Sequence, residues 1–226
     1  MAARTHHLGT ADHSNRLAAS CRAVGEELDL PPDELFELEL VAILHDIGKL
    51  AVPAAILDLA RPLDGAERAV VQAHTIRGAE MLTEIAGLAH LAPLVRSSHE
   101  HWDGSGYPDH LVGARIPLGA RVVFTVDAFD AMTNDRPYRR ALGYAEARRR
   151  IADGAGSEFD PRVVRAVLTA LRRRRVALRA RSRPTRARAA ASGRSPRPGR
   201  PRRRRTARTR SRPLSGRSPR GPAPRR

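Results

Sequence analysis

Around residue 45 the sequence reads Leu40-Val41-Ala42-Ile43-Leu44-His45-Asp46-Ile47-Gly48-Lys49, an apolar, helix-like run that ends in an adjacent imidazole and carboxylate. Charged side chains inside a core are costly unless they are paired or bound to a metal. Lys49 is the only lysine among the 41 lysine and arginine residues of the chain, so the strong preference for arginine does not extend to this position. The stretch therefore suits a cation held by His45 and Asp46, and a phosphate that meets Lys49.

Two predicted helices at the start of the chain carry imidazoles on their inward faces. The first covers about 10–28, where apolar residues recur at helical spacing: Leu17, Cys21, Val24 and Leu28. His13 lies one turn before Leu17 on the same stripe, so it points inward. The second helix begins at Pro31-Pro32-Asp33 and is ended by Gly48 and Pro53. Its related faces carry Leu35, Leu38, Val41 and His45.

Three further predicted helices each turn one ligand-type residue inward. Asp64 and Glu67 have the capping-box spacing and start a third helix through about residue 85. Its inner face holds Val70, His74, Gly78 and Met81, where Gly78 leaves room for something to approach the imidazole. A fourth helix, about 88–101, aligns Leu91, Val95 and His99. A fifth begins at Pro117 and aligns Ala120, Val123, Asp127 and Ala131.

The remaining pattern completes an all-α prediction. Two shorter helices are expected at roughly 144–152 and 161–171. No segment shows a convincing period-2 alternation, which a half-buried strand would require. The fold class predicted from the sequence is therefore an all-α helical domain.

Charge divides the chain into two parts. The 226 residues carry a formal net charge of +17, but residues 172–226 contain 23 arginines and no acidic residue. Residues 1–171 hold the other 18 basic residues and all 24 acidic ones, which gives them a net charge of −6. We predict one folded domain over 1–171 and a disordered Arg/Pro-rich tail over 172–226, because the tail has almost no apolar residues to bury.

Cysteine usage and hydropathy indicate the cellular setting. Cys21 is the only cysteine, so one chain can form neither a disulfide framework nor a cysteine-based metal site. A reducing cytoplasm fits this composition. No apolar run approaches the length of a membrane span, and the N-terminus lacks a signal-peptide pattern. The sequence therefore predicts a cytoplasmic protein without a transmembrane segment.

The predicted inward faces supply six imidazole and carboxylate ligands: His13, His45, Asp46, His74, His99 and Asp127. A single inward histidine is more often a hydrogen-bonded core residue than a metal ligand. An aspartate buried without a partner is harder to explain in this way, because it costs several kcal/mol. Six such ligands exceed the need of one tetrahedral ion and suit two first-row ions such as Fe, Mn or Zn. Bridged by Asp46, two ions about 3.5–4 Å apart could share a water, lower its pKa and align it for attack on phosphorus. Lys49 would neutralise a phosphate oxygen as charge develops.

Several motifs in the same order resemble the HD-GYP family, a branch of the HD metal-dependent phosphohydrolases. They are the His45-Asp46-Ile47-Gly48-Lys49 segment, then Ser98-His99-Glu100-His101-Trp102-Asp103-Gly104-Ser105-Gly106-Tyr107-Pro108, then 127–133, Arg136-Pro137-Tyr138-Arg139 and 156–161. The resemblance covers roughly residues 6–171. It implies an HD-domain helical bundle and a phosphodiesterase that hydrolyses cyclic di-GMP to linear pGpG, or onward to GMP, with a metal-bridging hydroxide.

The resemblance also implies roles for individual residues. Carried over by motif, the family's metal ligands fall on the six residues already named, and the implied cofactors are two divalent ions, Fe or Mn. Asp46 and Lys49 are the implied catalytic residues, with Lys49 contacting phosphate. Arg136 and Arg139 match positions that meet the phosphates and guanine of the dinucleotide, which the guanidinium fork suits. The alternative for these two arginines is a solvated loop pair.

The sequence departs from the family pattern at several points. Ser98 stands where members usually have the first of two consecutive histidines, and Gly9 stands where some have a glutamate that supports a third metal. Two ions are therefore expected rather than three. Members commonly carry an N-terminal sensory or receiver domain, so this chain is either a stand-alone domain or a part of a longer sensor protein.

The implied partners are a cyclic dinucleotide and a sensory or GGDEF-type signalling protein. The tail, with Arg202-Arg203-Arg204-Arg205 at its centre, could bind an anionic partner non-specifically, although its composition favours an extension without such a role. Two other functions stay open. One is an HD hydrolase acting on another nucleotide phosphoester, including a different cyclic dinucleotide. The other is a catalytically impaired module that binds cyclic di-GMP or a partner protein, a possibility that Ser98 keeps open.

Overall fold

The regular structure of the described residues is helical throughout. The computed structural model describes residues 11–135 and 140–181, with α-helices and short 3-10 helices (η) as follows: α1 (Ala11–Glu27), α2 (Pro32–Leu44), η2 (Ile47–Ala51), α3 (Ala54–Leu57), α4 (Gly65–Gln72), α5 (His74–Thr83), η3 (Ala89–Leu91), α6 (Ala92–Arg96), η4 (Gly113–Arg115), α7 (Leu118–Thr133), α8 (Tyr144–Asp153) and α9 (Pro161–Arg181). Extended pairing within these ranges is limited to two isolated bridges, His99–Tyr107 and Ala155–Phe159. The predicted all-α fold is confirmed.

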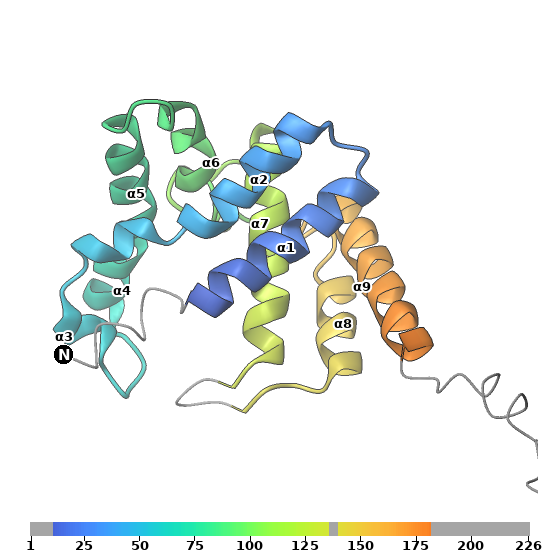
Figure 1. Ribbon diagram of the computed structural model, residues 1–226. Helices are drawn as coiled ribbons and strands as arrows, with labels where there is room; N and C mark the ends of the chain where they lie inside the picture. Colours follow the sequence, from blue (N-terminus) through green and yellow to red (C-terminus); the bar gives the residue numbers. More distant parts are fainter. Residues whose placement is uncertain (1–10, 136–139, 182–226) are drawn as a thin grey trace, which may run out of the picture. The chain divides into compact units, whose positions relative to one another are not determined.

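The hydrophobic core is built around α1 and α7. In Figure 1, α7 runs through the middle of the domain behind α1, with α8 and α9 on one side and α5 and α6 on the other. Helix α1 packs against α2, α7 and α9. Its predicted stripe is buried as expected, since Leu17 and Cys21 are fully inaccessible, and Val41 of α2 and Val123 of α7 are as well. Each buried side chain of this size contributes about 1.5–3 kcal/mol relative to an exposed one.

A close backbone contact joins η2 to α5. A Cβ added at Gly48 would overlap the carbonyl oxygen of His74, and one added at Gly78 would lie 3.2 Å from the backbone nitrogen of Gly48. The two glycines therefore let η2 pack directly against α5, which brings the end of α2 beside His74. The space that Gly78 was predicted to leave for an approach to the imidazole is taken by the backbone of Gly48 and the side chain of Val95.

Three predicted helices are shorter than expected. The second ends at Leu44, before the Gly48 that was predicted to end it. The third is divided at Ala73 into α4 and α5, and Val70 is 41% exposed rather than on an inner face. The fourth ends at Arg96, so His99 is not helical. His99 instead pairs with the loop that follows it, in an isolated bridge where the Tyr107 N–H donates to the His99 carbonyl at 3.1 Å.

The last helix is longer than predicted. Helix α9 runs to Arg181 and so crosses the boundary expected after Leu171. The division of the chain into 1–171 and 172–226 stays a prediction. The disorder expected of the tail falls mostly on residues 182–226, which lie outside the described residues.

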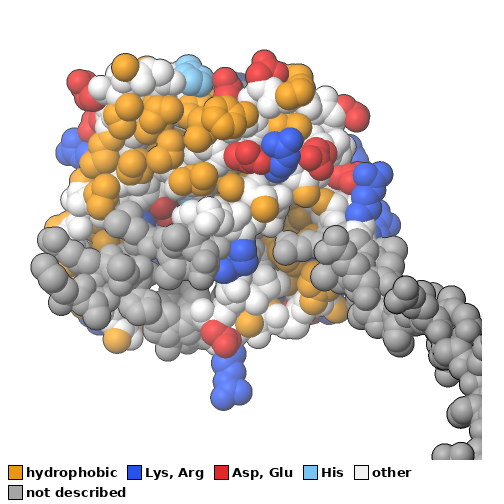
Figure 2. All heavy atoms as spheres, viewed as in Figure 1, with side chains coloured by type: hydrophobic (Ala, Val, Ile, Leu, Met, Phe, Trp, Pro, Cys, Tyr) orange, Lys and Arg blue, Asp and Glu red, His pale blue; other side chains and the backbone are white. Residues whose placement is uncertain are grey.

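One face of the domain is rich in apolar side chains. Figure 2 shows hydrophobic groups gathered on the face where α2 lies, and Phe36 and Ile43 of that helix are 59% and 44% exposed.

Among the described residues, no helix combines the length and apolar character needed to cross a bilayer.

Candidate metal centre

The end of α2 delivers an imidazole and a carboxylate to one buried point. His45 follows the last helical residue, and its side chain is 4% exposed. Its Nδ1–H donates to the carbonyl of Ala42 at 2.9 Å. In the neutral tautomer this leaves the lone pair on Nε2, which lies 3.5 Å from Oδ2 of Asp46. A backbone hydrogen bond of this kind is how proteins commonly orient a metal-binding histidine.

His74 repeats the arrangement from the start of α5. Its Nδ1–H donates to the Val71 carbonyl at 2.7 Å, and its Nε2 lies 3.3 Å from Oδ1 of Asp46. Two hydrogen-bond acceptors thus face each other in a buried place. His99 adds a third such atom, because its Nε2 is buried without a hydrogen-bond partner. Ligand atoms of Asp46, His74 and His99 all lie within 4.8 Å of one another.

The unsatisfied atoms fit a metal ion. Asp46 Oδ1, His74 Nε2 and His99 Nε2 are buried without a hydrogen bond among the described residues, which is costly unless a cation lies between them. Imidazole nitrogens with a carboxylate oxygen suit first-row divalent ions. The described residues therefore form a potential metal-binding triad, with His45 beside it.

The electrostatics keep these groups in their ligating forms. Burial alone would raise the pKa of Asp46, but neighbouring His45 and Lys49 hold that pKa well below its usual value. Burial holds the pKa of His99 well below its usual value, so this imidazole is neutral near pH 7. The Lys49 ammonium donates to Oδ2 of Asp46 at 2.6 Å, which places its charge at the edge of the triad.

His13 and Asp127 form a second group. The His13 Nε2 lies 3.7 Å from Asp127 Oδ1, and Nδ1 lies 2.8 Å from Oδ2 of Asp130. The hydrogen bond to Asp130 raises the pKa of His13 against the effect of burial, and the charge of Asp46 contributes as well. Helix α1 thus brings His13 within electrostatic reach of Asp46.

Sequence reasoning placed some residues and missed others. Asp130 orients His13 and was missed as a contributor, although its position one turn after Asp127 was a usable signal. Glu100, which is not among the six predicted ligands, is 1% exposed, and its carboxylate accepts backbone N–H groups. Ser98 is also buried, and its hydroxyl has no hydrogen-bond partner among the described residues. Arg136 and Arg139 lie outside the described residues.

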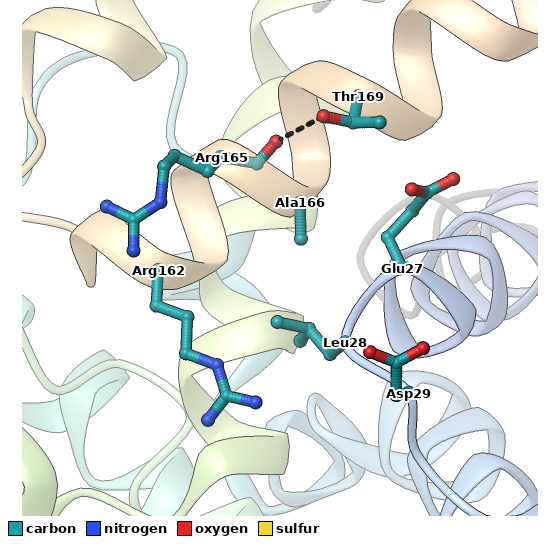
Figure 3. A pocket seen from close by; sticks show the side chains of 7 residues that line it. All are labelled: Glu27, Leu28, Asp29, Arg162, Arg165, Ala166 and Thr169. Carbon is teal, nitrogen blue, oxygen red and sulfur yellow. Dashed lines mark hydrogen bonds between the residues drawn. The ribbon is translucent and has the colours of Figure 1, made fainter.

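A separate cavity lies elsewhere in the fold. It measures about 250 Å³ and is lined by residues of α1, its C-terminal end and α9: Glu27, Leu28, Asp29, Arg162, Arg165, Ala166 and Thr169. Figure 3 shows the carboxylates of Glu27 and Asp29 on one wall and two arginines from α9 on the other. It shares no residue with the metal triad, and Glu27 is already paired with Arg173 at 2.7 Å.

A comparison with known protein families assigns the chain to one of them. Residues 2–163 match the HD domain family, and the chain belongs to that family. The resemblance to its HD-GYP branch is confirmed by the relatives that follow.

A cyclic di-GMP phosphodiesterase of Pseudomonas aeruginosa is 39% identical over 160 residues, which is 70% of this chain and 38% of the relative. The cyclic di-GMP phosphodiesterase response regulator RpfG of Xanthomonas campestris is 38% identical, over 71% of this chain and 43% of its own length. A 3′3′-cGAMP-specific phosphodiesterase of Vibrio cholerae is 36% identical, over 72% of this chain and 35% of its own. The chain thus spans 35–43% of the length of these relatives.

A solved structure supports the fold. The crystal structure of a cyclic GMP-AMP specific phosphodiesterase of Vibrio cholerae superposes with a TM-score of 0.57 at 23% identity, covering 72% of this chain and 44% of that one.

Proposed function

We propose that the chain is a metal-dependent phosphodiesterase that hydrolyses cyclic di-GMP to linear pGpG. The observation that carries the proposal is the set of buried, mutually facing acceptor atoms on Asp46, His74 and His99. The similarity to cyclic di-GMP phosphodiesterases at up to 39% identity supports the substrate class. In the reaction, water adds to one phosphodiester and the P–O3′ bond breaks, which leaves a 5′-phosphate and a 3′-hydroxyl.

The ligand set proposed for two divalent ions, Fe or Mn, comprises His13, His45, Asp46, His74, His99 and Asp127. Such ions lower the pKa of a water and offset negative charge on the phosphate. The side chains of the protein would bind and orient the substrate. Asp46 accepts from Lys49 at 2.6 Å, so the ammonium is held where a phosphate oxygen could become its second acceptor. Arg136 and Arg139 stay predicted contacts to the dinucleotide.

The proposal is tested by turnover and metal content measured together. Full-length protein reconstituted with Mn²⁺ or Fe²⁺ is incubated with cyclic di-GMP, and pGpG and GMP are followed by chromatography. We expect pGpG, and no product from His45→Ala or Asp46→Ala. Absence of turnover in protein that holds two ions per chain would refute the proposed activity, as would full activity of either variant.

A second substrate deserves the same assay, because a relative at 36% identity is named a 3′3′-cGAMP-specific phosphodiesterase. Parallel reactions with this mixed dinucleotide compare the two ratios of kcat to KM. A ratio in favour of 3′3′-cGAMP would change the assigned substrate and leave the metal chemistry as proposed.

A measurement of cyclic di-GMP binding, made beside the turnover assay, distinguishes an active enzyme from a module that only binds the dinucleotide. A catalytically impaired module would bind cyclic di-GMP and release no product; Ser98, with its unsatisfied buried hydroxyl, is the feature that favours it. The sensory or GGDEF-type partner, the anionic partner of the tail and the cytoplasmic location stay predictions.

A further inference from the structure

Glu100 is a buried carboxylate that none of the proposed chemistry uses. Its side chain is 1% exposed. Its Oε1 accepts the backbone N–H of Asp109 at 2.7 Å, and its Oε2 accepts that of Leu111 at 3.1 Å. A buried carboxylate is tolerated where such bonds satisfy it. Both donors follow Gly106-Tyr107-Pro108, so Glu100 ties the far end of this loop to the residue after His99.

The near end of the loop is closed on the same segment. The Tyr107 N–H donates to the His99 carbonyl at 3.1 Å. A Cβ added at Gly106 would overlap the backbone nitrogen of His101 and lie 2.6 Å from Cα of Glu100. The loop is therefore held against residues 99–101 from both sides, and its middle residue has a fixed place.

That place is on the face of a candidate metal ligand. The Tyr107 ring stacks on the His99 imidazole with centroids 5.2 Å apart and planes inclined by 7°. The same imidazole forms an edge-to-face pair with His74, with centroids 5.0 Å apart and planes at 74°. Stacked and edge-to-face arrangements of this kind are the ones that pairs of aromatic rings favour.

His99 differs from the other two histidines near Asp46 in how its plane is fixed. His45 and His74 each donate Nδ1–H to a backbone carbonyl. Within the part of the chain that the structure describes, the His99 imidazole makes no hydrogen bond, and Tyr107 packs flat against it. For His99, the stack with Tyr107 therefore fixes the ring plane, as the bond to a backbone carbonyl does for His45 and His74.

We propose that Glu100 is a positioning residue for His99. By holding Asp109 and Leu111 it keeps Tyr107 stacked on the imidazole, which directs Nε2 toward Asp46 and His74. The inference rests on the proposed metal centre. Residues that orient a metal ligand typically contribute about 10–100-fold to metal affinity.

The test measures Mn²⁺ affinity in the full-length chain by titration calorimetry. Glu100→Gln keeps the size of the side chain but turns an NH₂ group toward one of the two backbone donors. We expect Glu100→Gln and Tyr107→Leu each to weaken Mn²⁺ binding by about 10–100-fold. Tyr107→Phe keeps the stacked ring and should restore the affinity. Glu80→Gln, at a side chain that is 56% exposed, is the matched control.

A double variant separates positioning from a general structural effect. If Glu100 acts through Tyr107, adding Glu100→Gln to Tyr107→Leu should cause no further loss. A folded Glu100→Gln protein with wild-type affinity would overturn the proposal, and so would losses that simply add in the double variant. If Glu100→Gln does not fold, wild-type affinity in Tyr107→Leu overturns it alone.

A metal-free measurement distinguishes this inference from the proposed function. Histidine side-chain NMR of the metal-free protein should show one sharp set of His99 ring signals that broadens in Glu100→Gln and Tyr107→Leu. Unchanged signals in both variants contradict the positioning role. Wild-type protein that binds no Mn²⁺ refutes the proposed metal centre, while the ring signals still decide whether Glu100 orients His99.

Discussion

Asp46 is the residue on which the candidate site depends most. One carboxylate oxygen faces His74, and the other accepts from Lys49 and lies near His45. Without its charge, the imidazoles would have no anionic partner within the triad. The lysine beside it would also lose its acceptor.

Asp46→Asn should therefore abolish metal binding without a change of side-chain size. We expect Mn²⁺ affinity to fall by more than about 100-fold, beyond the 10–100-fold typical of residues that only orient a ligand. Turnover should fall to background. Metal content after dialysis and product formation check this, with the exposed Asp153→Asn as control. A variant that retained stoichiometric metal would remove Asp46 from the ligand set.

Asp130→Asn tests the second group of the site. The neutral amide oxygen is a weaker acceptor than the ionised carboxylate, so the 2.8 Å bond that orients the His13 imidazole is weakened. We expect metal affinity to fall by about 10–100-fold and added Mn²⁺ to restore much of the activity. Affinity equal to wild type would show that His13 needs no such support.

For individual residues, the periodicity of apolar residues was a good guide to which side chains point inward. It selected His45, His74 and the adjacent Asp46 from apolar neighbours at helical spacing. It missed Asp130 and Glu100, because Asp130 bonds His13 on another helix, and Glu100 bonds backbone N–H groups of the irregular loop that follows it. No local pattern shows which buried carboxylate will meet which backbone N–H.

Among the contacts between elements, that of η2 with α5 leaves the least room for a larger side chain. Gly48→Ala should destabilise the fold by more than about 2 kcal/mol, because its Cβ would overlap the backbone of His74 rather than a flexible side chain. Gly65→Ala is the matched control: no atom lies within 4 Å of the added Cβ, so the change should be neutral or stabilising by up to about 1 kcal/mol. Urea unfolding compares the two. Equal stabilities would contradict the close packing.

A buried ion pair joins α7 to the start of α9. Arg121 donates to Asp160 at 2.6 Å, and the two side chains are 15% and 4% exposed. Asp160→Asn should cost about 3–5 kcal/mol, since it leaves the guanidinium uncompensated. Glu80→Gln, which breaks an exposed pair, should cost no more than about 1 kcal/mol. Similar losses from both would show that Asp160 is effectively solvated.

The differences between predicted and observed helices have a common cause. Spacing of apolar residues located α1, α2 and α7 well, because each presents a long stripe to the core. The break at Ala73 and the end at Arg96 fall where no glycine or proline marks them in the sequence. Tertiary contacts of η2 and of Tyr107 set these positions, so local propensity could not predict them.

For the molecule as a whole, the strongly basic tail is a feature that the proposed chemistry does not use. Truncation after Arg181 retains all of α9, unlike a cut at Leu171. We expect an unchanged melting temperature and unchanged turnover, with weaker binding to RNA at low salt only, since arginines bind polyanions through counterion release. Loss of turnover on truncation would assign the tail a part in catalysis.

The central claim is that the imidazoles and carboxylates gathered around Asp46 hold metal ions that hydrolyse a cyclic dinucleotide. Metal analysis and cyclic di-GMP turnover on the same reconstituted sample test it most directly. We expect two Mn or Fe ions per chain and formation of pGpG, and loss of both in Asp46→Asn. Turnover that survives removal of the metal, or a folded chain that binds none, would contradict it.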